Sequence, residues 1–303
     1  MFQKILVPLD GSQLSEQALP LATMLAEAVN GELILLRSQV LVHMMMPEVA
    51  MEYDWVWPAG SRNGSRNEVA DYLGGLQKSL QRSGLTIHTM VVEGDEAGAI
   101  VDAADEEDVD LIVMSSHGYS GFTRWMLGSV TEKVLHSAPC PVFVVQSAQP
   151  IRHIMITLDG SQLAEKALEP GLEMARQFGA RVTLLQVNML LPLGYGEALS
   201  GEWAEMDVSQ GLFDQMREGS ESYLASVAAR YAGTIPMETH VIDGITVPSI
   251  LDYVESNDVD LAVMSTHGRS GLRRWIYGSV TARVLRSAPC SMLIIRPHAE
   301  ELR

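Results

Sequence analysis

The sequence contains little cysteine and no long hydrophobic run. It has 303 residues and two cysteines. No uncharged apolar stretch reaches the length of about 18 residues that a membrane-spanning helix needs. The first residues, MFQKILVPLDGS, also lack the apolar run of a signal peptide. Two cysteines are too few for the disulfide framework of a small secreted domain. We therefore expect a cytoplasmic protein without structural disulfides.

Cationic residues are scarce as well. There are 21 Lys and Arg against 38 Asp and Glu, so the formal net charge is -17. Clustered cations supply most of the affinity for a phosphate backbone or an anionic lipid surface, and we therefore expect neither nucleic acid nor membrane as a partner. An anionic ligand would have to be held by local backbone N–H groups. Hydrophobic residues make up 47% of the chain, which argues against disorder of the whole.

The chain repeats itself after about half its length. Residues 9–14 return unchanged as residues 158–163, and residues 109–140 match residues 259–290 at 22 of 32 positions. A period this long indicates a duplicated domain. A polar, proline-containing stretch separates the halves, so we expect two domains, residues 1–147 and 151–297. Each cysteine, Cys140 or Cys290, ends a Ser-Ala-Pro-Cys run at a strand entrance, which favours a small buried residue over a reactive thiol.

Each half is predicted to alternate strands and helices. In the first half, short apolar runs rich in β-formers cover residues 4–9, 32–37, 85–92, 109–115 and 141–145. Helical patterns lie between them, and the second half repeats the order. Nearly continuous apolar strands are typical of a parallel sheet covered on both faces. The sequence therefore predicts an α/β fold with two doubly wound, mostly parallel, five-stranded, Rossmann-like sheets, which bind ligands at the carboxyl ends of the strands.

The stretch that leaves the fourth strand carries the most chemical information. Ser115-Ser116-His117-Gly118 is followed, after nine residues, by Gly128-Ser129, and the second half repeats this pattern over residues 265–279. Small residues let the backbone approach a ligand closely. A Gly-Ser pair before a helix offers free N–H groups and the helix dipole to an anion, and its serine could cap the helix or donate to phosphate. A tight turn without a ligand explains one copy equally well, but two copies at the same spacing favour a site.

An aspartate ends the first strand of each half. Asp10 and Asp159 are each followed by Gly-Ser. Neighbouring strands of such a sheet would bring this carboxylate beside the loop that follows strand four. There it could accept hydrogen bonds from ribose hydroxyls or from an adenine amine. The alternative is that the aspartate only caps the first helix.

In combination, these residues resemble the universal stress protein family. The nucleotide motif of that family is glycine, two residues, glycine, nine residues, then Gly-Ser or Gly-Thr. The first half matches with Gly118 and Gly128-Ser129, and the second half repeats the match 150 residues later. Ser115 and Ser265 replace the opening glycine, which crowds the ribose side. The resemblance covers almost the whole chain twice, so the chain is similar to a tandem universal stress protein.

The resemblance implies that ATP binds in each half, with Mg²⁺ or Mn²⁺ as the metal that could accompany the phosphates, and that the setting is regulation or stress survival. Within the second site, Arg269 adds a cation where the first half has Tyr119. The residues expected to form the two nucleotide sites are Pro8, Leu9, Asp10, Ser38, Met114, Ser115, His117, Gly118, Gly128, Ser129, Val130 and Thr131 in the first half, and Thr157, Leu158, Asp159, Val187, Met264, Ser265, His267, Gly268, Arg269, Gly278, Ser279, Val280 and Thr281 in the second.

Motifs of fast ATP-hydrolysing or phosphate-transferring enzymes are missing. The chain has neither a Gly-Lys-Ser/Thr P-loop nor the His-Arg-Asp and Asp-Phe-Gly motifs of kinases. His117 and His267 could act as general bases, but a hydrogen bond that fixes the loop explains them as well. We therefore assign no catalytic residue and no metal-ligand set, and expect an ATP-binding regulatory protein that is at most a slow ATPase. The alternatives are a nucleotide-using hydrolase or transferase and a ligand-free scaffold of the same fold.

The sequence also suggests how the domains assemble. The last strands, residues 141–145 and 292–295, are short, apolar and placed at a sheet edge, and exposed edges invite pairing. Because domains of the similar family pair through this strand, the resemblance implies a pseudo-symmetric pair within one chain. The segments 39–67 and 188–209 are rich in Met and Trp or in leucine, and we expect them to serve packing or a homodimer interface.

Overall fold

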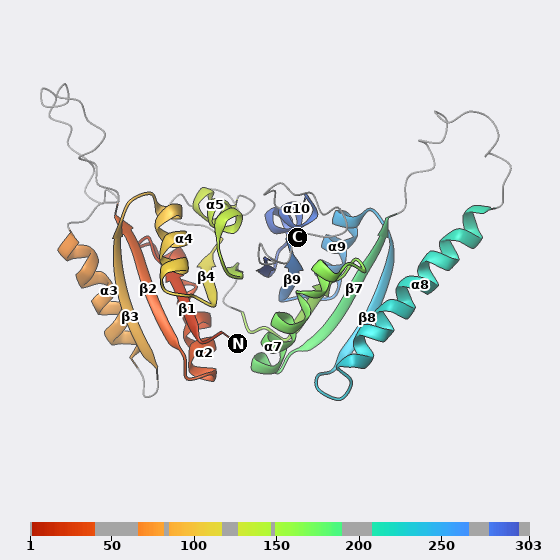
Figure 1. Ribbon diagram of the computed structural model, residues 1–303, viewed down its shortest axis with the longest axis horizontal. Helices are drawn as coiled ribbons and strands as arrows, with labels where there is room; N and C mark the ends of the chain where they lie inside the picture. Colours follow the sequence, from red (N-terminus) through yellow and green to blue (C-terminus); the bar gives the residue numbers. More distant parts are fainter. Residues whose placement is uncertain are drawn as a thin grey trace, which may run out of the picture. The chain divides into compact units, whose positions relative to one another are not determined.

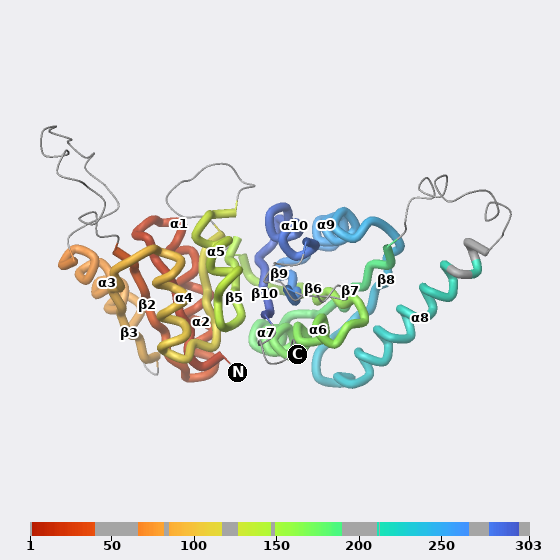
Figure 2. The backbone as a smooth tube through the Cα atoms, turned by 45° about the horizontal axis from the view of Figure 1, so that its top comes forward, coloured from red at the N-terminus to blue at the C-terminus, as the bar shows by residue number. Residues whose placement is uncertain are grey.

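The structure is a computed structural model that divides into two compact units, Met1–Ala148 (unit 1) and Gln149–Arg303 (unit 2). Figures 1 and 2 show that each unit is a sheet with helices packed on it. The structure describes residues 2–39, 66–81, 85–116, 127–146, 149–189, 208–266 and 279–296.

The described part of unit 1 contains a parallel sheet of five strands. They are β1 (Lys4–Pro8), β2 (Glu32–Gln39), β3 (Thr86–Glu93), β4 (Leu111–Ser115) and β5 (Val142–Val145). Their spatial order is β3-β2-β1-β4-β5, and each neighbouring pair is parallel. The chain thus moves outward from β1 to β3, then crosses back to β4 and continues to β5. This is the order of a doubly wound sheet.

Helices cover both faces of this sheet. They are α1 (Gln13–Glu16), α2 (Leu19–Ala28), α3 (Arg66–Leu80), α4 (Glu96–Glu106) and α5 (Ser129–Ser137). Since crossover connections are right-handed, helices that precede outward steps to β2 and β3 lie on one face, and those that precede β4 and β5 lie on the other. Helix α4 packs against α5 accordingly. The ends follow local signals: Ser12 caps α1, and Asp95 caps α4 by accepting from the N–H of Gly98.

Unit 2 has the same topology. The strands are β6 (His153–Thr157), β7 (Arg181–Met189), β8 (Met237–Gly244), β9 (Leu261–Ser265) and β10 (Ser291–Ile295), and the helices are α6 (Gln162–Glu165), α7 (Leu168–Phe178), α8 (Val208–Arg230), α9 (Thr246–Ser256) and α10 (Ser279–Ser287). The strands lie in the order β10-β9-β6-β7-β8, and their pairings are parallel. The predicted fold class is therefore confirmed for both halves.

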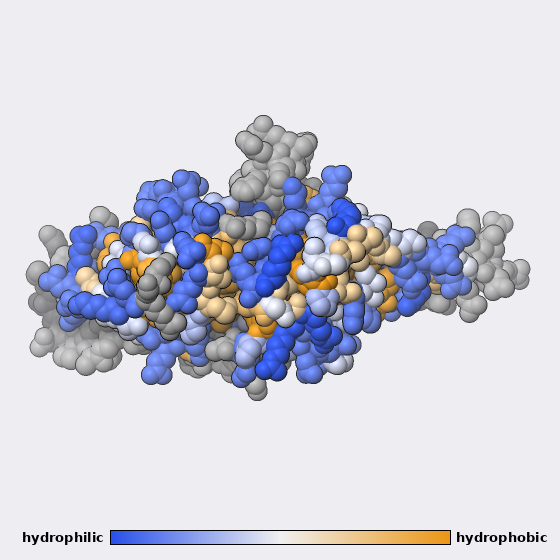
Figure 3. Space-filling model, turned by 90° about the horizontal axis from the view of Figure 1, so that it is seen from below, coloured by the Kyte–Doolittle hydropathy of each residue, from blue (hydrophilic) through white to orange (hydrophobic). Residues whose placement is uncertain are grey.

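The core of each unit lies along its central strands. All residues of β4 and β9 are buried, whereas β3 and β8, each at one edge of its unit's sheet, are largely exposed or half-buried. In the view of Figure 3, hydrophilic residues occupy most of the outer surface, with apolar residues between them. None of the described helices is long and apolar enough to cross a membrane.

Both cysteines are buried free thiols. Burial raises the pKa of Cys140 and of Cys290 to about 12, so both remain protonated at neutral pH. A protonated, buried thiol is a poor nucleophile. The expectation of a small core residue is confirmed.

At the amino-terminal ends of the strands, a carboxylate joins β1 to β4. Asp110, which precedes β4, accepts hydrogen bonds from the backbone N–H groups of Gln3 and Lys4, both at 2.9 Å. Asp260 accepts in the same way from Arg152 and His153 in unit 2. The repeated Val-Asp-Leu sequence carries this contact, whose role the sequence analysis missed.

Unit 2 places a histidine at the start of its first strand. His153 is 2% exposed, with Nδ1 2.9 Å from the carbonyl oxygen of Asn257 and Nε2 2.8 Å from Oγ1 of Thr183. Burial lowers the pKa of His153, and the charge of Arg181 lowers it further. The Asn257 carbonyl and the charges of Asp260 and Glu238 act in the opposite direction and do not reverse the shift. The folded protein therefore favours the neutral imidazole.

We predict that unit 2 loses stability in mild acid because of His153. Below the unfolded-state pKa of about 6.5, the unfolded chain binds a proton that the folded chain resists, so the free energy of unfolding falls between pH 7 and 5.5, with an upper limit of about 1 kcal/mol set by the unfolded-state pKa. The stability contributed by this group is present above the unfolded pKa and is lost as the pH falls toward the folded one.

Urea unfolding at a series of pH values measures this loss. The variant His153→Gln should show a shallower decline than the unmodified chain. His88→Gln serves as the matched control because His88 is an exposed histidine on β3. An equal pH dependence in the unmodified chain and in His153→Gln would contradict the assignment.

Candidate functional site

The strand order reverses between β1 and β4, and the candidate residues gather at that point. Ile5 pairs with Leu111 and Leu6 with Ile112, so the two strands run side by side to the same edge. In unit 2, Ile154 pairs with Leu261. In open α/β sheets the crevice beyond the carboxyl ends of strands at such a reversal is the usual ligand position. The structure thus places residues 8–10 beside residues 114–116, and their counterparts likewise.

The strand-one aspartate fixes a turn. Asp10 Oδ1 accepts from the backbone N–H of Ser12 at 2.9 Å and from its hydroxyl at 2.6 Å. Asp159 Oδ1 accepts from the N–H of Ser161 at 2.9 Å. The glycine between aspartate and serine has a positive φ, +83° at Gly11, which other residues rarely adopt. Serine, not aspartate, is the N-cap of the first helix in each unit, so the helix-capping alternative is wrong.

The second element is the start of the helix that follows strand four. The N–H of Gly128 donates to the carbonyl of Ser116 at 2.9 Å, and Thr131 Oγ1 donates to the carbonyl of Ser115 at 3.3 Å. These two bonds hold the first turn of α5 against the end of β4. Gly128 is the N-cap and has no side chain with which to cap the turn. Of the two roles left open for Ser129, capping the helix is therefore wrong, because Ser129 is the first residue of the helix.

Unit 2 repeats the anchor. Thr281 Oγ1 donates to the carbonyl of Ser265 at 2.9 Å, which holds α10 against the end of β9. Ser265 itself is 9% exposed, and its hydroxyl has no hydrogen-bond partner among the described residues. The threonine of the Gly-Ser-Val-Thr run thus joins helix to strand in both units, although the sequence analysis gave it no separate role.

Other candidate residues contribute in different ways. Leu9, Met114, Leu158 and Met264 have buried side chains, so only their backbone can face a ligand. Ser38 extends past the end of β1, because β1 pairs with β2 only as far as Leu36. The residues that lie outside the described part of the chain are His117, Gly118, His267, Gly268, Arg269 and Gly278.

Comparison with known proteins identifies the family. Residues 1–146 and 150–296 each match the model of the Universal stress protein family. The chain belongs to this family. A universal stress protein of Mycolicibacterium smegmatis is 25% identical over 279 residues, which cover 85% of this chain and 86% of that protein. Universal stress protein MJ0531 of Methanocaldococcus jannaschii is 34% identical over 146 residues, which cover 48% of this chain and 83% of that protein.

Solved structures show the same fold. A universal stress protein from Archaeoglobus fulgidus DSM 4304 has a TM-score of 0.67 at 20% identity, with 98% of this chain and 99% of that chain covered. Protein PA1789 from Pseudomonas aeruginosa PAO1, described as functionally unknown, has a TM-score of 0.74 at 17% identity, with 99% and 94% covered. The fold of both units of this universal stress protein is thus a known α/β fold.

Both units of this universal stress protein place a tyrosine and a glutamate beside the site. The hydroxyl of Tyr72 donates to Glu16 at 2.8 Å, and that of Tyr223 donates to Glu165 at 3.0 Å. Burial raises the pKa of both tyrosines above the usual value, and the hydrogen-bonded glutamate raises it further. Each tyrosine therefore stays neutral and ties helix α3 or α8 to the first short helix.

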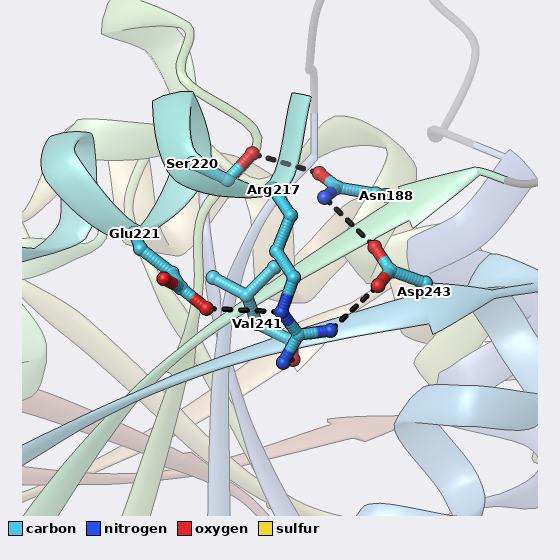
Figure 4. A network of polar contacts seen from close by, with 6 residues as sticks. All are labelled: Asn188, Arg217, Ser220, Glu221, Val241 and Asp243. Atoms are coloured by element: carbon cyan, nitrogen blue, oxygen red, sulfur yellow. Dashed lines mark hydrogen bonds and ion pairs between the residues drawn. The ribbon is translucent and has the colours of Figure 1, made fainter. Parts of the chain in front are cut away.

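The units differ at the carboxyl end of their second strand. In unit 2, Ser220 on α8 accepts from Gln186 Nε2 at 2.9 Å and donates to Asn188 Oδ1 at 2.8 Å (Figure 4 shows the second bond). Asn188 Nδ2 donates to Asp243 at 3.0 Å, and Arg217 Nη1 reaches the same carboxylate at 2.6 Å. This buried amide network holds the helix, β7 and β8 together.

Unit 1 has different residues at the positions of this network. The positions equivalent to Gln186, Asn188 and Ser220 hold Arg37, Gln39 and Val69. Val69 is an apolar residue that is 2% exposed, so no hydroxyl is available to join the two strand residues. The Arg-to-Gln difference between the repeats at positions 37 and 186 is the sequence signal that could have predicted this divergence.

We predict that Ser220→Val destabilises unit 2 even though valine is the residue of unit 1. The change leaves the amide of Gln186 and the oxygen of Asn188 buried without their shared hydroxyl, which costs about 2 kcal/mol. Urea unfolding measures the effect. Ser226→Val is the control, because Ser226 is exposed on the same helix and donates only to the carbonyl of Tyr223. Equal losses in the two variants would show that the network contributes nothing specific.

Proposed function

We propose that each unit of this universal stress protein binds ATP at the carboxyl edge of its sheet, and that the protein is an ATP-binding regulator of a stress response and at most a slow ATPase. One repeated arrangement carries the proposal. In both units, a threonine anchors the first turn of a helix to the end of β4 or β9, and a turn-forming aspartate follows the neighbouring strand, β1 or β6.

The two parts of this arrangement suit different parts of a nucleotide. The first N–H groups of a helix have no partner within the helix and carry a partial positive charge, which suits phosphate oxygens. A carboxylate is an acceptor for ribose hydroxyls or for an adenine amine. Backbone donors also suit an anionic ligand on a chain with a formal charge of -17, which has few lysines and arginines to spare.

We propose a metal ion only as a companion of the ATP phosphates. Within the described residues, no group of three or more His, Cys, Asp or Glu side chains is placed to hold a metal ion. In this proposal, Mg²⁺ or Mn²⁺ enters with ATP and offsets the charge of its phosphates on a chain with a formal charge of -17. A cytoplasmic location, pairing of the two units through β5 and β10, and a homodimer of chains remain predictions of this proposal.

Mass spectrometry of the purified, denatured chain tests whether a nucleotide is bound at all. We expect released ATP or ADP, approaching one nucleotide per unit in a preparation that has not been dialysed. Calorimetry with added ATP and Mg²⁺ follows for protein stripped of its nucleotide. Absence of released nucleotide together with absence of ATP binding would overturn the proposal in favour of a ligand-free scaffold.

Ser129→Pro tests the helix N-terminus. Proline removes the N–H of the first helical residue but is well tolerated at that position, and Gly128 already has the extended conformation (φ -62°, ψ 142°) required before proline. Loss of one charge-assisted hydrogen bond should weaken ATP binding to unit 1 about tenfold. The matched control, Ser129→Ala, keeps the N–H and removes only the hydroxyl.

Calorimetry on both variants separates the two donors. We expect the proline variant to bind ATP much more weakly than the alanine variant while their melting temperatures agree. The same pair of changes at Ser279 repeats the experiment in unit 2. If proline at both positions leaves ATP affinity unchanged, the phosphates do not lie at these helices.

A further inference from the structure

Unit 1 carries a cation at the end of its second strand that unit 2 lacks. The N–H of Leu9 donates to the carbonyl of Leu36 at 2.8 Å. Arg37, the next residue of β2, therefore lies beside the carboxyl end of β1. Its guanidinium lies against Gly11: a Cβ added there would be 2.7 Å from Nη1. Gly11 therefore provides both the positive φ of the turn and the space for the arginine.

An aromatic ring holds this guanidinium in place. Arg37 Cζ lies 5.2 Å from the centroid of the Tyr72 ring, a distance typical of a cation–π contact. The hydroxyl of that ring is bound to Glu16. After burial and Glu16, the charges of Arg37 and Asp10 also act on the Tyr72 pKa, in opposite directions, as expected if both groups lie close to the ring.

The donors of this guanidinium are not used within the described part of the chain. No described carboxylate, carbonyl or amide oxygen forms a hydrogen bond or an ion pair with Arg37. A cation–π contact uses none of the guanidinium N–H groups as hydrogen-bond donors to an oxygen, so these groups remain available to an acceptor. A partly exposed, positioned arginine with unused donors is a site for an anion.

The equivalent position in unit 2 is neutral and engaged. Gln186 donates to Ser220, and the nearby arginines are neutralised by carboxylates: Arg217 by Asp243 and Glu221, and Arg230 by Glu165. The described part of unit 2 therefore offers no counterpart of the unpaired Arg37. Within the residues that the structure describes, the two sites share the helix N-terminus and the aspartate but differ in the cation Arg37.

Two anion-binding groups thus lie on opposite sides of Asp10 in unit 1. Helix α5 begins on the β4 side of β1, and Arg37 comes from β2 on the other side. In doubly wound nucleotide-binding folds, a carboxylate near the ribose accepts hydrogen bonds from the ribose hydroxyls. Where the ribose carries a phosphate, a nearby arginine binds that phosphate instead. We infer that unit 1 binds a nucleotide that carries a phosphate on the 2′ or 3′ position of the ribose in addition to its 5′ phosphate, and that unit 2 does not.

This inference rests on the proposed nucleotide site, and the test separates the two. The full chain, stripped of nucleotide, is titrated in a calorimeter with adenosine 5′-phosphate, adenosine 2′,5′-bisphosphate and adenosine 3′,5′-bisphosphate. Each bisphosphate has one phosphate more than the monophosphate, and the two bisphosphates differ only in the position of that phosphate. We expect one of the two sites to prefer a bisphosphate over the monophosphate by about tenfold, as one charge-assisted contact would give, and to lose part of this preference at high salt. The preferred isomer identifies the hydroxyl next to Arg37.

Variants assign the preference to Arg37. In Arg37→Gln, which introduces the residue of unit 2, the bisphosphate and the monophosphate should bind equally. Arg66→Gln removes the same charge from an exposed arginine on α3, 3.7 Å from Glu93, and should keep the preference. If Arg37→Gln does not fold, as judged by its melting curve, Arg37→Lys is used, which keeps the charge without the planar fork and should reduce the preference.

The outcomes distinguish the two hypotheses. Binding of all three ligands with equal affinity to the unmodified chain overturns the inference and leaves the nucleotide site intact. A preference that survives in the Arg37 variants, or that disappears equally in Arg66→Gln, overturns it as well. Failure of all three ligands and of ATP to bind overturns the proposed function itself.

Discussion

The parallel pairing of β1 with β4, and of β6 with β9, is the constraint on which each unit depends. These strands are buried, and buried backbone groups must find partners, so each strand must pair with its neighbour along its length. At one edge the register is held by Asp110 or Asp260. At the other it brings an aspartate-bearing turn beside the first turn of a helix. The geometry of the candidate site is thus a consequence of core pairing and not of the loops alone.

The anchor between strand and helix makes this arrangement specific. Thr131 and Thr281 are 3% exposed, and each uses its hydroxyl to hold a helix N-terminus at a strand end. A helix fixed in this way presents its first N–H groups in a defined direction without any side-chain cap. Preorganised donors of this kind are effective because they need no rearrangement when an anion arrives.

The two units share this framework but differ in how the end of the second strand packs against the following helix. Unit 2 closes the end of its second strand with a buried amide and hydroxyl network, while unit 1 uses an apolar residue, Val69, and directs Arg37 toward the turn. Duplication allows such divergence, because one copy can retain an activity while the other changes. Among the residues that the structure describes, the two copies differ chemically at the end of the second strand, next to the shared elements.

Much of this structure was determined by the sequence alone. The internal repeat, the apolar strands and the position of Asp10 or Asp159 before a glycine follow from local patterns, because periodicity, turn chemistry and buried strands are encoded over a few neighbouring residues. Only the tertiary structure shows that Gly128 is the N-cap of α5 and that Asp110 joins β1 to β4. The same holds for the contacts of the Arg37 guanidinium with Gly11 and with the ring of Tyr72. These contacts join residues far apart in the chain, and only the packing of helix on sheet determines which of them meet.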